Sequence, residues 1–332
     1  MDVAVIGAGS WGTALAQTAA RAGNDVRIWA RRPEVAAALN RDHRNPDYLS
    51  DIQLDEGIRA TADLDKAVAG ARLILVVTPS KVMRSTAEAL RDAGAAQDAT
   101  VVLCTKGVEA ATGLVPLQVF EEVMGGRERL ACLSGPNHAE EVVACLPTGT
   151  VAASFSEACA RQVQEALGTE EFRVYTSDDP VGVELCAAAK NVVAIAVGLS
   201  YGMGFGDNTA AMLMTRGQAE MGRLAVACGG QALTCMGLAG TGDLIATCMS
   251  RHSRNRSFGE ALATGDTLEA YEERRHMVVE GAQACRSLLG LSQRHSVELP
   301  LASAVEAVIW EGMPAADAAR SLLARAPKPE FY

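Results

Sequence analysis

The amino-acid sequence predicts an α/β protein in which an N-terminal, doubly wound parallel sheet is followed by a second, all-helical domain. Three observations support this prediction. Short apolar runs alternate with helical patterns through the first half of the chain, as in parallel sheets covered by helices on both faces. A glycine-rich turn directly follows the first apolar run. Beyond Ser177, strand patterns give way to long Ala- and Val-rich helical runs.

The predicted strands are short, β-branched or apolar, and bounded by turn residues such as Thr78-Pro79. They cover Val3–Ile6, Val26–Trp29, Leu73–Val77, Thr100–Cys104, Leu130–Leu133, Val151–Ser154 and Phe172–Tyr175. Helical patterns lie between them, for example over residues 82–90 and 157–167. Ligands of such sheets bind beyond the carboxyl ends of the strands, so the turns there are where we look for chemistry.

The helical half begins at Pro180, because Ser177-Asp178-Asp179 offers capping side chains just before a proline in the first turn. We therefore predict two domains, over residues 1–177 and 178–332. Predicted helices in the second domain cover residues 180–199, 208–227, 258–263, 281–289, 301–309 and 315–324.

The first strand leads into a turn with the spacing Gly7-x-Gly9-x-x-Gly12, and a helical run opens at once after it. Gly7 permits the tight turn, Gly9 lets the backbone approach a pyrophosphate, and Gly12 lets the helix pack closely on the strand. The helix N-terminus then faces the phosphate charge. A tight turn without a ligand is the alternative. The strand, turn and helix together favour a Rossmann-type domain that binds NAD(H) or NADP(H).

The end of the second strand bears on the choice of cofactor. NAD-specific domains usually carry an acidic residue there, whereas this chain has Arg31 and Arg32. Two arginines suit a 2′-phosphate, so NADPH is favoured over NADH. The alternative is that both arginines are solvated charges at a helix start.

Composition restricts the classes of partner. The 332 residues are 49% hydrophobic and 21% charged, with a net charge of −10. This acidic balance argues against nucleic acid or an anionic membrane as a partner. No signal peptide, membrane-spanning run or zinc-ligand spacing is evident, and nine scattered cysteines indicate reduced thiols in the cytoplasm.

Two polar turns end predicted strands in the first domain. Lys106 follows the strand at 100–104, where a lysine can point into the ligand crevice. Gly135-Pro-Asn137-His-Ala139-Glu140 follows the next strand and leads into a helix. Its backbone N–H groups are placed to bind an anion or a carbonyl oxygen.

Lys190 is the most unusual residue of the second domain, because it is the only charge in the helical run from Leu185 to Val197. Burial of a lone ammonium is costly and typically lowers a lysine pKa toward the range useful for proton transfer. We interpret Lys190 as a proton donor to a developing alkoxide. The alternative is a lysine whose stem packs in the core while its head reaches solvent.

Two further segments of the second domain carry polar groups. Asp243 ends a glycine-rich stretch and is either a helix N-cap or the anionic partner of a buried lysine. Shortly after it, Arg251, Arg254 and Arg256 lie among hydroxyl residues and His252 at a predicted helix start. Three arginines there indicate an anion site, and hence a phosphorylated substrate.

Taken jointly, these motifs resemble the bacterial NAD(P)-dependent glycerol-3-phosphate dehydrogenase family, from the first strand to about Pro300. Asn137, where the family commonly has serine or threonine, and the variable pair Arg31-Arg32 depart from its pattern. The resemblance rests on Gly7-Ala-Gly-Ser-Trp-Gly-Thr-Ala14, Lys106-Gly107, Gly135-Pro-Asn-His-Ala-Glu140, Ala189-Lys-Asn191, Gly240-Thr-Gly-Asp-Leu244, Thr247-Cys248, Ser253-Arg-Asn255 and Val278-Val-Glu-Gly281.

This resemblance implies reversible reduction of dihydroxyacetone phosphate to sn-glycerol 3-phosphate, a phospholipid precursor, by a metal-free homodimer. It makes Lys190 the general acid/base, supported by Asp243 and Thr247, while Lys106 holds and polarises the substrate. Further substrate contacts are implied for Gly135, Asn137, Asn191, Ser253, Arg254 and Asn255. Cofactor contacts beyond the three glycines are implied for Ser10, Trp11, Arg31, Arg32, Lys106, Ala139, Arg254, Val278 and Glu280.

Two other functions are compatible with the same residues. One is a related Rossmann reductase that acts on a hydroxy acid or ketopantoate, since a carboxylate would also use an arginine site. The other is a non-catalytic NADP(H)-binding sensor, which is expected to lack the buried lysine and its aspartate.

Overall fold

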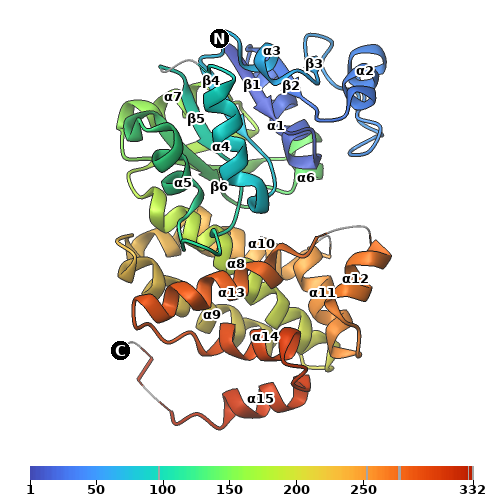
Figure 1. Cartoon of the computed structure of the whole chain (residues 1–332). Helices are drawn as coiled ribbons and strands as arrows, with labels where there is room; N and C mark the ends of the chain where they lie inside the picture. Colours follow the sequence, from blue (N-terminus) through green and yellow to red (C-terminus); the bar gives the residue numbers. More distant parts are fainter. Residues whose placement is uncertain (96–97, 252, 276–277, 328, 331–332) are drawn as a thin grey trace. The chain divides into compact units, whose positions relative to one another are not determined.

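The computed structural model describes all residues except 96–97, 252, 276–277, 328 and 331–332. The chain forms two compact units, Met1–Glu184 and Leu185–Tyr332 (Figure 1). Helix α8 (Pro180–Gly202) begins in the first unit and continues into the second. The domain boundary predicted at residues 177 and 178 lies just ahead of this helix.

The first unit is built on an eight-stranded sheet with the order β3-β2-β1-β4-β5-β6-β7-β8. This order reverses between β1 and β4, which is where doubly wound sheets bind ligands. The strands are β1 (Asp2–Ile6), β2 (Asp25–Trp29), β3 (Arg59–Thr61), β4 (Leu73–Val76), β5 (Thr100–Leu103), β6 (Leu130–Ser134), β7 (Thr148–Ser154) and β8 (Phe172–Ser177).

The predicted parallel sheet is confirmed except at one pair, because β7 runs antiparallel to β6. The link between them contains only the five-residue helix α6 (Ala139–Val143). A helix of that length advances about 7 Å, too little to return the chain along a strand of about 16 Å. The sequence patterns also missed β3, a three-residue strand with no apolar run.

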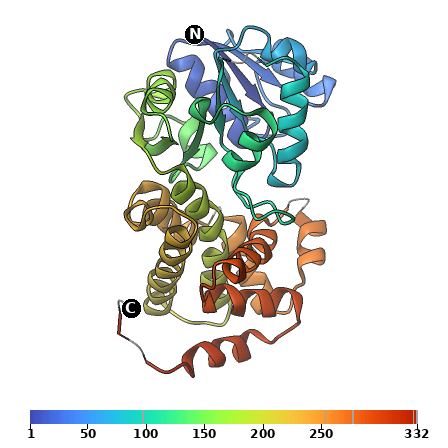
Figure 2. The ribbon, with the colours of Figure 1, turned by 60° about the vertical axis from the view of Figure 1, so that its left-hand side comes forward.

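Helices lie on both faces of this sheet (Figure 2). Val3 and Val5 of β1 share one core cluster with Leu15 of α1 (Ser10–Arg21), Val142 of α6 and Val163 of α7 (Glu157–Leu167). Helices α4 (Met83–Asp92) and α5 (Pro116–Met124) pack against each other. The remaining elements of this unit are α2 (Pro33–Asp42), α3 (Leu64–Val68), η1 (Ser80–Val82) and η2 (Arg127–Arg129).

The described residues of the second unit form helices and the loops between them, as predicted. Helices α10 and α12 were not predicted, because α10 is short and α12 is rich in charges, so neither shows apolar residues repeating at helical spacing over several turns. Besides α8, the elements are α9 (Asp207–Ala227), η3 (Ala232–Met236), the π-helical turn η4 (Leu238–Gly242), α10 (Asp243–Met249), α11 (Arg254–Ala263), α12 (Leu268–Arg275), α13 (Glu280–Arg294), α14 (Pro300–Trp310) and α15 (Ala315–Leu323).

Helix α8 starts where its capping residues predict. The Asp179 carboxylate accepts a hydrogen bond of 2.9 Å from the Gly182 N–H. Further along, buried Glu184 accepts from the Leu117 N–H at 3.1 Å, and burial raises the pKa of Glu184 to about 8. Helix α8 is long and apolar enough to cross a membrane, but its whole apolar window is buried inside the protein, as in a core helix.

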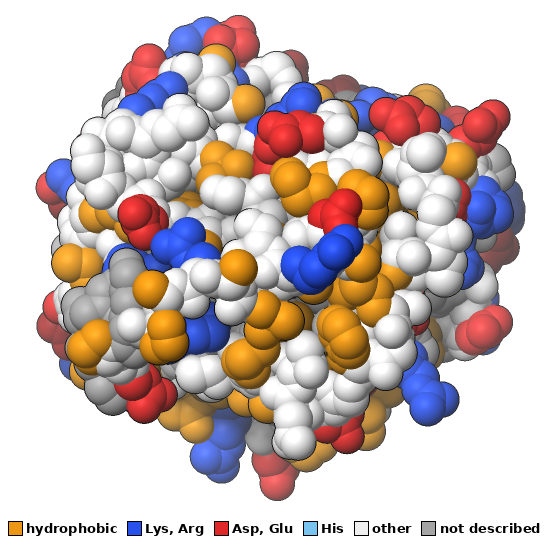
Figure 3. Space-filling model, turned by 90° about the horizontal axis from the view of Figure 1, so that it is seen from below, with side chains coloured by type: hydrophobic (Ala, Val, Ile, Leu, Met, Phe, Trp, Pro, Cys, Tyr) orange, Lys and Arg blue, Asp and Glu red, His pale blue; other side chains and the backbone are white. Residues whose placement is uncertain are grey.

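Charged side chains of both signs share the surface with apolar ones, as one face of the molecule illustrates (Figure 3). Among large apolar residues, Leu233 is 74% exposed, Leu323 71% and Met236 68%. Scattered apolar side chains are ordinary on protein surfaces, so these residues do not by themselves define a binding site.

Candidate active site

The glycine turn after β1 has the geometry that a dinucleotide pyrophosphate requires. Gly7 has a φ of +123°, and a Cβ on it would lie 3.0 Å from the Val77 carbonyl oxygen of the β4 end. A Cβ on Gly12 would overlap the Gly7 carbonyl oxygen, so only glycine allows α1 to start this close to the strand. A Cβ on Gly9 would meet open space. No side chain caps α1 at Gly9, which leaves the helix N-terminus available to phosphate oxygens.

The two arginines that follow β2 differ in their surroundings. Arg31 is exposed. Arg32 precedes α2 as its N-cap residue and forms an ion pair with Asp47. Of these two arginines, Arg32 is paired with a carboxylate, whereas no ion pair of Arg31 is observed among the described residues. Trp11, also expected near the cofactor, packs against Phe172 with ring centroids 6.5 Å apart.

The turns after β5 and β6 hold the remaining candidates of the first unit. Lys106 is half-buried in the segment after β5. Gly135 packs so tightly on β7 that a Cβ would lie 2.8 Å from the Gly149 carbonyl oxygen. Asn137 donates to that same oxygen at 3.0 Å, so its amide group anchors the turn to β7. Ala139 is buried at the start of α6.

In the second unit, Lys190 of α8 is buried beside an acidic partner. The Lys190 side chain is 6% exposed, and its Nζ donates to the Asp243 carboxylate and to Thr247 Oγ1, the latter at 2.7 Å. Thr247 Oγ1 also donates to the Asp243 carbonyl oxygen, at 2.6 Å. The alternatives in which Lys190 reaches solvent or Asp243 is an N-cap are wrong, because Asp243 is the first residue of α10 and faces Lys190.

The π-helical turn η4 brings Asp243 to this position. Gly240 of η4 packs directly on Cys235, where a Cβ would overlap the Cys235 backbone, and α10 starts three residues later. An ammonium and a carboxylate lose their hydration when they are buried. The attraction between the two charges offsets that loss. The adjacent thiol stays neutral, because burial raises the pKa of Cys248 to about 12.

Asn191, next to Lys190, joins three helices through Asn255. Asn255 Nδ2 donates to Asn191 Oδ1 at 3.0 Å, and Asn255 Oδ1 accepts from the Gly281 N–H of α13 at 3.0 Å. Helices α8 and α11 approach closely here, since a Cβ on Gly259 would overlap the Ile195 carbonyl oxygen. Both asparagines are buried, so their orientation is set by these contacts.

The predicted site of three arginines is wrong for Arg256. Its guanidinium is engaged by Glu260 at 2.9 Å and by the Met249 carbonyl oxygen at 2.6 Å, and it lies over the Tyr201 ring. Arg254 is exposed at the start of α11, beside Asn255, and Arg251 is also exposed. His252 lies outside the described residues.

Ser253 and the residues at the start of α13 complete the set of candidates. The buried Ser253 hydroxyl accepts from the Arg256 N–H at 3.3 Å and so caps α11. This cap explains why α11 begins at Arg254, four residues earlier than the predicted helix. Val278 is 45% exposed, and half-buried Glu280 begins α13.

Comparison with known proteins places this geometry in a family. Residues 2–160 match the model for the N-terminus of NAD-dependent glycerol-3-phosphate dehydrogenase, and residues 179–320 match the model for its C-terminus. A glycerol-3-phosphate dehydrogenase [NAD(P)+] from Nocardia farcinica is 49% identical, over 98% of this chain and 99% of the relative. The chain belongs to the NAD-dependent glycerol-3-phosphate dehydrogenase family.

Solved structures agree with membership of this family. The glycerol-3-phosphate dehydrogenase from Coxiella burnetii has a TM-score of 0.92 and 36% identity, and the match covers 98% of this chain and 99% of that chain. A ketopantoate reductase from Ralstonia eutropha is more distant, with a TM-score of 0.60 and 18% identity over 96% of this chain and all of that chain. That second likeness shows a shared fold alone.

Proposed function

We propose that this chain reduces dihydroxyacetone phosphate to sn-glycerol 3-phosphate with NAD(P)H, and catalyses the reverse reaction. One observation carries the chemical assignment: a lysine ammonium, nine-tenths or more buried, is paired with a buried carboxylate in a chain of this family. A sensor that only binds a dinucleotide does not need such a pair, whose burial is costly. The product supplies the backbone of phospholipids.

The chain's own residues divide the remaining work. The glycine turn and the N-terminus of α1 bind the pyrophosphate of the cofactor, whose nicotinamide supplies the hydride when bound. Lys190 donates a proton from Nζ to the substrate oxygen that becomes the hydroxyl group. Asp243 and Thr247 orient Lys190 through the two hydrogen bonds that they accept. Lys106 polarises the substrate carbonyl.

The substrate phosphate is assigned to the start of α11. Arg254 is exposed there, and neighbouring Asn255 is held rigidly by Asn191 and Gly281. Arginine matches phosphate geometry with two parallel hydrogen bonds. The N-terminus of α11 adds its partial positive charge.

The activity is tested by following NADPH and NADH oxidation with dihydroxyacetone phosphate, with ketopantoate, and without a substrate. We expect oxidation with dihydroxyacetone phosphate and none above background with ketopantoate. Preferential turnover of ketopantoate would establish the hydroxy-acid alternative. Binding of NADPH without turnover of either compound would favour the sensor.

Arg254→Ala is expected to raise the KM for dihydroxyacetone phosphate by about tenfold or more, because a charge-assisted phosphate contact is lost. Arg251→Ala is the matched control, since Arg251 is another exposed arginine three residues away. An unchanged KM in Arg254→Ala would place the phosphate elsewhere. A simultaneous loss of NADPH affinity would show that Arg254 also contacts the cofactor.

Arg31→Glu combined with Arg32→Glu is expected to lower the ratio of kcat/KM for NADPH over NADH by about tenfold, because carboxylates repel a 2′-phosphate. The single change at Arg31 is expected to account for most of the shift, since Arg32 is already paired with Asp47. If the ratio stays constant in both variants, both arginines are surface charges without a role in cofactor choice.

The assembly and compartment are also part of the proposal. We expect a homodimer, which the molar mass from light scattering after size exclusion would test. A reducing compartment such as the cytoplasm is supported by the nine cysteines, all described, which form no disulfide.

A further inference from the structure

The segment that carries Lys106, here called the β5–α5 loop (residues 104–115), is attached to the β4–α4 connection on both sides of the lysine. Thr105 Oγ1 donates to the Thr78 carbonyl oxygen at 2.7 Å. On the other side, Gly107 has a φ of +148° and packs on Ser80, where a Cβ would lie 2.9 Å from the Ser80 Cβ. The residues on either side of Lys106, Thr105 and Gly107, are therefore both held against the β4–α4 connection.

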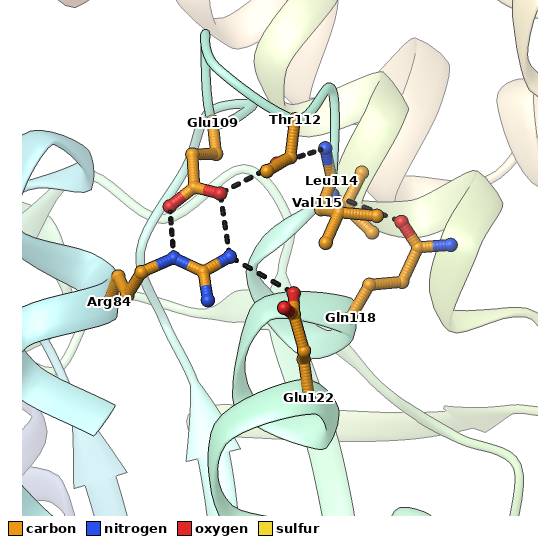
Figure 4. A network of polar contacts seen from close by, with 7 residues as sticks. All are labelled: Arg84, Glu109, Thr112, Leu114, Val115, Gln118 and Glu122. Carbon is orange, nitrogen blue, oxygen red and sulfur yellow. Dashed lines mark hydrogen bonds and ion pairs between the residues drawn. The ribbon is translucent and has the colours of Figure 1, made fainter. Parts of the chain in front are cut away.

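A polar network closes the rest of the loop around Glu109 (Figure 4). The Glu109 carboxylate accepts from Nε and Nη2 of Arg84, at 2.9 and 2.8 Å, and from Thr112 Oγ1 at 2.6 Å. Thr112 Oγ1 in turn accepts from the Leu114 N–H at 3.2 Å. The Glu109 backbone adds bonds to Leu114 at 2.8 Å and to Gly113 at 2.7 Å.

Arg84 connects this loop to two helices. It lies on α4, and its Nη2 also donates to the Glu122 carboxylate of α5 at 3.1 Å. The Glu109 side chain is 16% exposed, whereas Glu122 is 56% exposed. The hydrogen bonds that Arg84 donates lower the pKa of Glu109, and the carboxylates of Glu109 and Glu122 that accept them raise the pKa of Arg84. A two-point contact from arginine fixes a carboxylate in direction as well as in distance.

We propose that Arg84 and Glu109 are positioning residues, whose ion pair holds the β5–α5 loop in the conformation that presents Lys106 to the substrate. Glu109 is three residues from Lys106, and both segments that flank the lysine depend on the same β4–α4 connection. The inference rests on the proposed role of Lys106 in holding and polarising dihydroxyacetone phosphate. A displacement of about 1 Å at such a group is enough to weaken catalysis severely.

Glu109→Gln keeps the shape of the side chain but removes its charge. We expect the KM for dihydroxyacetone phosphate to rise about tenfold, with little change in NADPH affinity by fluorescence titration. Glu122→Gln is the matched control, because it removes a charge beside the same guanidinium but lies outside the loop, and its KM is expected within about twofold of wild type. Equal effects of the two variants would overturn the inference.

A double variant distinguishes a positioning role of Glu109 from a purely structural one, because only a positioning role makes the effect of Glu109→Gln depend on Lys106. If Glu109 acts through Lys106, Glu109→Gln should have little further effect on KM or kcat in a Lys106→Ala background. If the fold-changes of Glu109→Gln and Lys106→Ala simply multiply in the double variant, the two residues act independently and the positioning role is overturned. If Lys106→Ala alone leaves the kinetics unchanged, the proposed role of Lys106 itself fails, and the inference fails with it.

Thr112→Val provides a milder variant in case Glu109→Gln folds poorly. It removes an exposed hydroxyl that donates to Glu109 and accepts from the Leu114 N–H, and it leaves the ion pair in place. We expect a smaller rise in KM, of about twofold to threefold, with an unchanged melting temperature. A lower melting temperature with unchanged KM would show that the network stabilises the fold without positioning Lys106.

Discussion

Replacement of Lys190 by alanine is expected to reduce kcat for dihydroxyacetone phosphate by about 10² to 10⁴, the usual consequence of losing a positioned proton donor. The cofactor pyrophosphate is assigned to the glycine turn and not to Lys190, so the NADPH dissociation constant should change little. Steady-state kinetics and fluorescence titration with NADPH test both expectations. A variant whose kcat lies within about threefold of wild type would exclude Lys190 as the general acid/base.

The same change has a structural cost that must be separated from catalysis. Without Lys190, the buried Asp243 carboxylate loses its ammonium partner, which is expected to lower the free energy of unfolding by about 3–5 kcal/mol. The double variant Lys190→Ala with Asp243→Ala removes both charges. We expect it to recover much of the lost stability and none of the turnover. Recovery of turnover along with stability would mean that Lys190 serves the fold alone.

Asp243→Asn is the second change with a large expected effect, because it removes the carboxylate that faces the buried Lys190 ammonium. The charged form of Lys190 then loses its main stabilisation, and the lysine is expected to release its proton at a lower pH than in wild type. Since the protonated form is the donor, activity in the reducing direction should disappear at a lower pH. The pH profile of kcat measures this acidward shift.

Thr247→Val is the matched control for this variant. It removes the hydroxyl that accepts from Lys190 Nζ at 2.7 Å but keeps the carboxylate. Its profile is expected to shift less than that of Asp243→Asn, because a neutral acceptor stabilises an ammonium less than an opposite charge does. A profile for Asp243→Asn that superimposes on wild type would contradict the assigned pairing.

Local patterns in the sequence were sufficient for much of this protein. The turn Gly7-x-Gly9-x-x-Gly12 after β1 is recognisable because its spacing is local, and Gly12 meets a steric demand made by Gly7, five residues earlier. The start of α8 follows from Asp179 and Pro180, and the unusual character of Lys190 from the apolar residues on its own helix. All of these signals lie within one or two turns of chain.

Other features depend on residues that are remote in sequence, and only the tertiary structure decides them. Lys190 and Asp243 are 53 residues apart, and Arg84 and Glu109 are 25 apart. Arg256 resembled a ligand-binding arginine until its contacts with Glu260 and Tyr201 were visible. The sequence by itself determined the longer helices of the second unit, the glycine turn and the unusual position of Lys190, because their energetics are local. Packing decided which buried charges meet, because a carboxylate is drawn to a particular ammonium only after folding has excluded water from both.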